Sequence, residues 1–171
     1  MNSTIRKILT LVVVIIMALG SFIGCSLGIK FNIVYDKMGG FGYKETNGGV
    51  AIDMLELVNS LQDLKDLCDE WNNLAFDEES ESFSSELSEK IRSYDEAYFS
   101  DKVLIIYSFW RGHRKETRIN SIEVEGTQLI VNARYNDKRG IFTDEAFNWL
   151  ILIEVSKVDI VGATTVQIVH K

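Results

Sequence analysis

Two stretches of this chain are apolar at almost every position, and they restrict its fold more than any other feature. Residues 103–110 read VLIIYSFW, and residues 147–155 read FNWLILIEV. Successive side chains of a strand point to opposite faces, so a strand that is apolar on both alternations needs cover on both faces. Both stretches are therefore predicted to be buried strands, the first of them central in a sheet.

Further strands are predicted around these two. Residues 121–125 and 128–135 alternate on either side of a Glu125-Gly126 turn, which is typical of an antiparallel hairpin. A turn at residues 111–113 leads from the central strand into this hairpin. The remaining strands are expected at residues 31–35, at 164–169 and, although a helix could also begin there, at 50–58.

The clearest helix is predicted over residues 61–71, where apolar residues recur at spacings of three and four. Ser60 and Asp63 have the spacing of a capping box at its start. An acidic surface loop is expected at 72–85, followed by a second, shorter helix at 86–94. The apolar stripe of the first helix consists of Leu61, Leu64, Leu67, Cys68 and Trp71.

Together these elements predict an α+β fold over residues 31–171, a single domain in which a mostly antiparallel sheet packs against one principal helix and a shorter second helix. The glycines at 39–42 and 47–49 predict a flexible turn region between strands. They do not open directly into a helix as a phosphate-binding loop does, so no nucleotide site is expected there.

The N-terminus has the three parts of a secretory signal peptide. Arg6 and Lys7 precede an apolar run over residues 8–19, which small residues follow. The run is shorter than the ~20 residues that a bilayer-spanning helix needs. The sequence that ends it, Phe22-Ile23-Gly24-Cys25, resembles the lipobox of bacterial lipoproteins, with Phe22 in place of the usual leucine.

This resemblance implies that residues 1–24 are removed, that Cys25 carries a diacylglyceryl and a palmitate group, and that residues 25–30 are a short linker. The alternative is an uncleaved anchor with an incidental cysteine. Either arrangement places the domain on the extracytoplasmic face of the bacterial cell membrane. A lipidated Cys25 cannot form a disulfide, so Cys68, on the apolar face of the predicted helix, is expected to be a buried structural thiol.

The charge of the mature chain excludes one class of partner. Without the two basic residues of the signal peptide, 16 basic residues stand against 25 acidic ones, a net charge of −9. Nucleic-acid binding needs clustered Lys and Arg, so no nucleic acid is expected as a partner. The same charge repels anionic headgroups, whereas residues 26–30 reach at most about 17 Å from Cys25. The domain is expected close to the membrane but held off its surface.

Residues 144–157, DEAFNWLILIEVSK, together with the strand and hairpins before them, resemble the C-terminal domain of PrcB, a protease-complex subunit. The resemblance covers residues 50–171, and Ser156 stands where proline is expected. It implies a module that binds a protein or stabilises a protease and has no catalytic residues of its own. Similar domains occur in small clostridial lipoproteins.

Residues suited to catalysis or metal binding are few. His113 and His170 are the two histidines, one in a predicted turn and one beside the C-terminus, and neither predicts a Ser-His or Cys-His relay. Too few Cys and His ligands remain for zinc, so no metal or other cofactor is expected. Glu154 interrupts an apolar strand; it either pairs with Lys or Arg across the sheet or emerges into water, and emergence is favoured.

One segment is a candidate binding site, because it places cationic side chains beside an aromatic one at a predicted hairpin tip of an acidic domain. The alternative is a solvated turn with the tryptophan buried. The function expected is that of a non-catalytic, membrane-anchored protein-binding module, or else a receptor for a small molecule or glycan; an enzyme is the third hypothesis. The candidate site consists of Trp110, Arg111, His113, Arg114 and Lys115.

Overall fold

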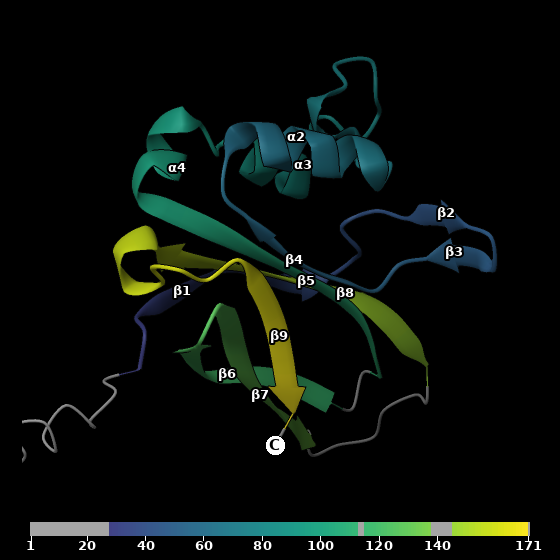
Figure 1. Cartoon of the computed structure of the whole chain (residues 1–171). Coiled ribbons are helices and arrows are strands. Elements are labelled where there is room, and N and C mark those ends of the chain that lie inside the picture. The colour runs from purple at the N-terminus through teal and green to yellow at the C-terminus, as the bar shows by residue number, and fades with distance from the viewer. Residues whose placement is uncertain (1–27, 113–114, 138–144, 171) are drawn as a thin grey trace, which may run out of the picture.

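The computed structural model describes residues 28–112, 115–137 and 145–170 of the chain. These residues form an α+β fold with a mostly antiparallel arrangement of strands, as predicted (Figure 1). The elements are β1 (Phe31–Met38), β2 (Lys44–Thr46), β3 (Gly49–Ala51), β4 (Met54–Val58), α2 (Leu61–Glu70), η1 (Leu74–Phe76), α3 (Glu86–Arg92), α4 (Glu96–Asp101), β5 (Lys102–Gly112), β6 (Lys115–Glu125), β7 (Gln128–Asp137), β8 (Ala146–Ser156), η2 (Lys157–Asp159) and β9 (Thr165–His170).

The two apolar stretches are the middle strands of a four-stranded antiparallel sheet with the order β1-β8-β5-β4. Strands β5 and β8 pair along their whole length, from Lys102 opposite Ser156 to Gly112 opposite Ala146. Seven successive residues of β5, from 103 to 109, are buried. The prediction of buried strands covered on both faces is confirmed.

The remaining long strands form a second sheet, with the order β6-β7-β9, on the face of the first sheet opposite the helices (Figure 1). The predicted β6–β7 hairpin is confirmed, and Gly126 has the positive φ of 63° that its tight turn requires. Strand β9 runs parallel to β7. Strands β5 and β6 belong to different sheets and do not pair as a hairpin, which corrects the prediction of a hairpin tip between them.

Local sequence signals account for the helical layer. At the start of α2, the Ser60 hydroxyl accepts a hydrogen bond from the Asp63 N–H at 3.0 Å, and the Asp63 carboxylate accepts one from the Asn59 N–H at 3.2 Å. The predicted cap and the second helix, α3, are confirmed. Helix α4 was not predicted, because six residues capped by Asp95 are too few to show an amphipathic stripe.

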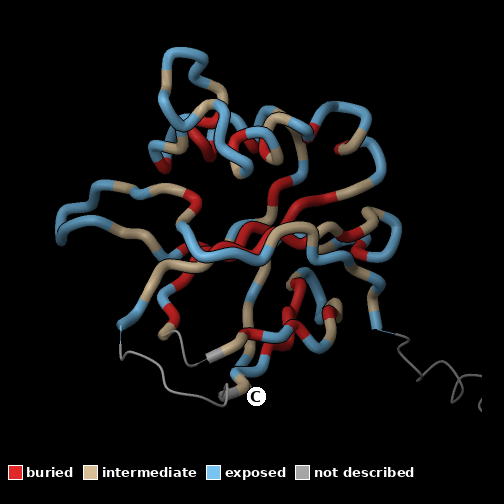
Figure 2. The backbone as a smooth tube through the Cα atoms, turned by 180° about the vertical axis from the view of Figure 1, so that it is seen from behind, coloured by how far each residue is buried: buried red, intermediate tan, exposed pale blue. Residues whose placement is uncertain are grey.

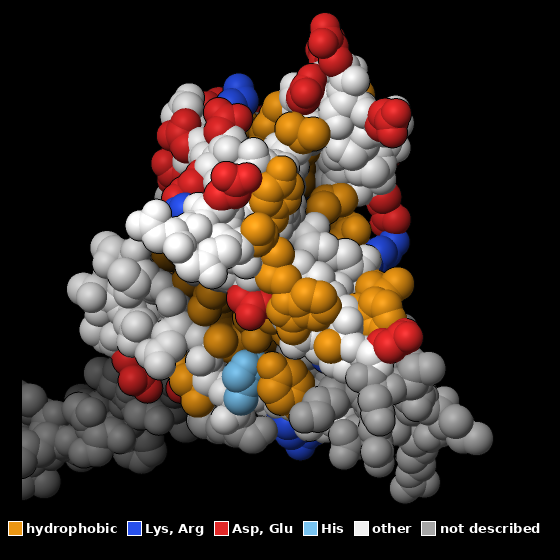
Figure 3. Space-filling view, turned by 90° about the vertical axis from the view of Figure 1, so that its right-hand side faces the viewer, with side chains coloured by type: hydrophobic (Ala, Val, Ile, Leu, Met, Phe, Trp, Pro, Cys, Tyr) orange, Lys and Arg blue, Asp and Glu red, His pale blue; other side chains and the backbone are white. Residues whose placement is uncertain are grey.

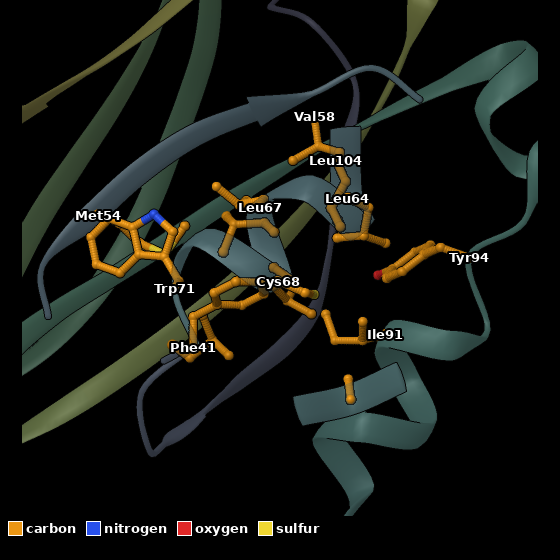
Figure 4. Packing of buried hydrophobic residues seen from close by; sticks show 14 of the residues in the cluster. Phe41, Met54, Val58, Leu64, Leu67, Cys68, Trp71, Ile91, Tyr94 and Leu104 are labelled. Carbon is orange, nitrogen blue, oxygen red and sulfur yellow. The ribbon is translucent and has the colours of Figure 1, made fainter. Parts of the chain in front are cut away.

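The four-stranded sheet therefore separates two hydrophobic cores, which Figure 2 shows as buried stretches on either side of it. In the core beneath the helices, Phe41, Met54 and Trp71 lie at one end, and Ile91 and Tyr94 at the other (Figure 4). The second core lies between the sheets and contains Ile105, Ile122, Leu129, Val131 and Ile153. Burying such side chains contributes about 1.5–3 kcal/mol each.

Two predictions about single residues in the helix-side layer have different outcomes. Cys68 is 1 % exposed, as expected for a structural thiol, and burial raises its pKa to about 12. Glu154 does not emerge into water, so the favoured expectation for it is wrong. Its carboxylate lies 3.5 Å from the Lys90 ammonium and 3.2 Å from that of Lys102, because strand β8 is covered at this point by helix α3 and flanked by β5.

The glycine-rich region is an ordered structure that fastens a two-stranded ribbon, β2–β3, to the end of α2. The Tyr43 N–H donates to the Trp71 carbonyl at 2.7 Å, and the Asn73 amide donates to the Phe41 carbonyl at 2.6 Å. Gly42 makes this close approach feasible, since a Cβ there would lie 2.2 Å from the Trp71 carbonyl oxygen. The sequence predicted a flexible turn region, and the ribbon within it is a finding of the structure.

Candidate functional site

The molecule has two opposite ends along the direction of its central strands, β5 and β8. The first described residues, 28–30, lie at one end together with the turn at 157–163; we call this the tether end. The β2–β3 ribbon and the last residues of β5 lie at the other, which we call the distal end (Figure 1). The candidate residues that the sequence singled out belong to the distal end.

Trp110 is the most prominent side chain of the distal end. It is 50 % exposed, and its backbone N–H donates to the Asp53 carboxylate at 3.1 Å, which fixes this part of β5 beside the strand β4. The expectation that a solvated turn would leave the tryptophan buried does not hold. Two further apolar side chains, Tyr43 and Val50, are exposed on the ribbon.

Figure 3 looks onto this end of the molecule. Hydrophobic side chains run in a band from the helical layer, across the edge of the sheet, to the histidine, and acidic side chains lie mainly on either side of the upper part of this band. Exposed apolar surface that is gathered on one face and bordered by charge is typical of a contact site. One acidic side chain lies within the band, and most of the others visible in this view lie beside it.

Arg111 lies inside the molecule, and this corrects the expected geometry of the candidate site. Only 4 % of the residue is exposed, because its side chain points between the two sheets. The guanidinium lies 3.5 Å from the centre of the Trp149 ring and 6.0 Å from that of Phe109. Burial lowers the pKa of Arg111, while the charges of Asp36 and Glu116 oppose this shift.

The other predicted site residues are not shown to lie beside Trp110 or Arg111. His113 and Arg114 lie outside the described residues, as does Cys25, the predicted lipidation site. Lys115 begins β6, opposite Asp137 of β7. The structure thus brings Trp110 to the surface and Arg111 into the interior, and leaves the binding role of the whole segment a prediction.

A cluster that the sequence did not predict lies beside these residues. Nε2 of His170 is 3.2 Å from the Tyr107 hydroxyl and 3.3 Å from the Tyr135 hydroxyl, and the rings of His170 and Tyr135 are stacked with 4.4 Å between centroids. These residues come from β9, β5 and β7, so only the packing of the two sheets unites them. No spacing along the chain could have indicated the cluster.

The electrostatic surroundings of this cluster favour its neutral form. Burial raises the pKa of Tyr107, and the Asp53 carboxylate adds to the shift. Burial lowers the pKa of His170. A neutral imidazole can accept a hydrogen bond at Nε2 from a tyrosine hydroxyl, whereas protonation would turn the same atom into a donor. The cluster can therefore present an aromatic surface with polar atoms at its edge.

Within the described part of the chain, no three His, Cys, Asp or Glu side chains are placed to hold a metal ion. A search of the same residues for a helix with the length and apolarity to cross a bilayer finds none. Comparison of the chain with protein-family models, with curated proteins and with solved structures gives no match. The relation to PrcB stays a prediction from the sequence.

Proposed function

We propose that this protein is a lipoprotein, anchored through Cys25 to the extracytoplasmic face of a bacterial cell membrane, that binds another protein through its distal end and catalyses no reaction of its own. The observation that carries the binding role is the half-exposed Trp110 at the distal end, opposite the first described residues, 28–30. An anchored module meets a partner most readily through the end that points away from its anchor.

The chemistry of the distal end supports a protein as the ligand. Tryptophan, tyrosine and arginine are enriched at the energetically important positions of protein interfaces. Trp110 is held by the hydrogen bond of its backbone to Asp53, and the ribbon beside it is fastened to α2, so little conformational entropy is lost when a partner docks. The resemblance of residues 50–171 to PrcB favours an envelope protease or its complex as this partner.

A small molecule or glycan is the alternative ligand, and one observation favours it. Tyr135 is exposed and stacked on His170, and two tyrosine hydroxyls lie at the imidazole edge. An aromatic face with adjacent hydroxyl groups suits a sugar ring. The surface depressions that border the N-terminal segment, in contrast, are lined by residues such as Lys30, Asn32 and Ser121.

Metabolic labelling with radioactive palmitate tests the anchor. The wild-type chain and a Cys68→Ala variant are expected to take up label and to float with membranes, whereas Cys25→Ala is expected to do neither. A Cys25→Ala protein that still floats would indicate an uncleaved membrane anchor and would contradict lipidation.

Quantitative mass spectrometry of proteins that co-purify from solubilised membranes tests the binding role. We expect a specific partner to be depleted at least five-fold by Trp110→Ser and to be unaffected by Leu74→Ser, which removes an equally exposed apolar side chain from the helical layer. Equal recovery of every protein with both variants would contradict binding through the distal end.

A further inference from the structure

The structure fixes the point at which the N-terminal segment leaves the domain. The Ile29 N–H donates to the Ile122 carbonyl of β6 at 3.1 Å. Gly28, Ile29 and Lys30 also share a shallow surface depression with Asp159, the last residue of η2. The chain therefore emerges between β6 and the turn at 157–163, at the left of Figure 1.

This exit point shortens the tether that the sequence predicts. Ile29 is hydrogen-bonded to β6 and Gly28 lies beside Asp159, and only Ser26 and Leu27 stand between Gly28 and Cys25 in the sequence. Three residue steps span at most about 11 Å, against the roughly 17 Å reached when residues 26–30 are all extended. A lipid on Cys25 thus holds Gly28, and the neighbouring turn, at the level of the headgroups.

The turn beside the exit carries the two most exposed large apolar side chains of the described chain, Val158 at 78 % and Val161 at 81 %. Between them, Ile160 is 5 % exposed and anchors the turn in the core between the sheets. The Lys157 ammonium donates to the Asn59 and Phe99 carbonyls at 3.0 and 2.5 Å, which holds the base of the turn. The two valines are therefore presented outward by an ordered structure.

We propose that the turn at 157–163 docks on the phospholipid bilayer, with Val158 and Val161 inserted at the boundary between headgroups and acyl chains. This proposal rests on the lipid anchor of the proposed function. Two valines bury too little area to bind a membrane alone, but the anchor supplies a high effective concentration and makes their insertion intramolecular. The two inserted side chains are uncharged, and the exposed Asp159 between them would stay among the headgroups, on the side of Lys30 with which it shares the surface depression.

Docking of this turn orients the whole domain. With the tether end against the bilayer, the central strands carry Trp110 away from the membrane, toward a partner in the extracytoplasmic space. Free rotation about the tether would instead present every face of the domain to the bilayer in turn. The sequence predicts a domain held off the surface, whereas the structure favours one contact at a defined place.

Quenching of a fluorescent label by membrane lipids tests the proposal. The full chain, lipidated in cells, is purified with Val161→Cys labelled with bimane and reconstituted into vesicles of phosphatidylcholine and phosphatidylglycerol that contain doxyl-labelled phospholipid. Buried Cys68 does not compete for the label. The matched control carries the label at Val50→Cys, on the distal ribbon, where the side chain is 62 % exposed.

We expect doxyl lipid to quench the label at 161 at least three-fold more than the label at 50, and aqueous iodide to show the reverse order. Adding Val158→Ser to the labelled Val161→Cys protein should reduce the lipid quenching at least two-fold. Equal lipid quenching at both positions in vesicles that carry the protein would overturn the docking proposal and leave the anchor intact. Loss of vesicle flotation together with absence of palmitate would overturn the anchor, and the docking proposal with it.

Discussion

Two charged side chains with little exposure, one near each end of the central strands, have different surroundings: Arg111 is buried and Glu154 is largely covered. Glu154, toward the tether end of β8, lies between two lysine ammonium groups at 3.2 and 3.5 Å. Arg111, at the distal end of β5, lies against aromatic rings, and among the described residues no carboxylate comes within ion-pair distance of it. The charge of Glu154 is thus neutralised by two ion pairs, whereas that of Arg111 is held by ring contacts and by the more distant charges of Asp36 and Glu116. Removing one partner of a buried ion pair leaves an uncompensated charge, so the two sites should respond differently to substitution.

Charge reversal at Arg111 should have the largest effect. Arg111→Glu would bury a carboxylate near Asp36 and Glu116, so we expect a loss of about 3 kcal/mol or more in the free energy of unfolding. In the solvated turn that the sequence predicts for residues 111–113, the same reversal would change stability little. Urea denaturation of the variant measures the difference.

The matched variant Arg111→Met separates charge from packing. It keeps a long apolar side chain between the sheets and removes the charge, so the free energy of unfolding should change by less than about 1 kcal/mol. A loss of more than about 2 kcal/mol in the free energy of unfolding would show that the surroundings of Arg111 stabilise its charge. Arg111 and Glu154 would then no longer differ in this respect.

Removal of the compensated charge should have the next largest effect. Glu154→Ala leaves the ammonium groups of Lys90 and Lys102 without their shared partner, and both lysines retain some access to water. We therefore expect a loss of about 2 kcal/mol, less than the ~3–5 kcal/mol that breaking a fully buried pair costs. Glu45→Ala, on the exposed ribbon, serves as the control and should change stability by less than about 0.5 kcal/mol.

The contacts that fasten the β2–β3 ribbon to the end of α2 should contribute somewhat less to the free energy of unfolding. Gly42→Ala would place a Cβ 2.2 Å from the Trp71 carbonyl oxygen, so the ribbon must shift, at a cost of about 1–2 kcal/mol. Gly48→Ala has no heavy atom within 4 Å of the added Cβ and should be nearly neutral. Thermal unfolding of the two variants measures the difference. Equal melting temperatures would show that the close approach of Gly42 to Trp71 does not stabilise the fold.

The smallest effect concerns the pH dependence of stability at the distal end. Because burial lowers the pKa of His170 in the folded chain below the unfolded value of about 6.5, the unfolded chain binds more protons near that pH. Stability should therefore fall as the pH drops below about 6.5, and His170→Gln should reduce this slope. An unchanged slope between pH 7 and pH 5 would show that His170 titrates as it does in the unfolded chain.

The sequence predicted those parts of the fold that depend on local patterns. The buried strands, the β6–β7 hairpin, the capping of α2 and the burial of Cys68 follow from periodicity and from residue types that lie near one another in the chain. The division of the strands into two sheets does not, because it depends on which strands pair across long intervals. The errors at Arg111 and Glu154 share this cause: each side chain's surroundings come from elements distant in sequence.

The candidate site was predicted in part. Trp110 was selected for its type and its place at the end of a strand, and the structure leaves it exposed. The cluster of Tyr107, Tyr135 and His170 had no signal in the sequence, since three strands from both sheets supply it. The turn with Val158 and Val161 also has no signal in the sequence, because its place beside residues 28–30 depends on the folded structure.

Position-specific photo-crosslinking in living cells tests the central claim, that the two ends of an anchored domain face different partners. Benzoylphenylalanine in place of Trp110 is expected to yield an adduct with a single protein, and benzoylphenylalanine in place of Val161 an adduct with phospholipid. The same adducts from both positions, or a lipid adduct from position 110, would contradict the account.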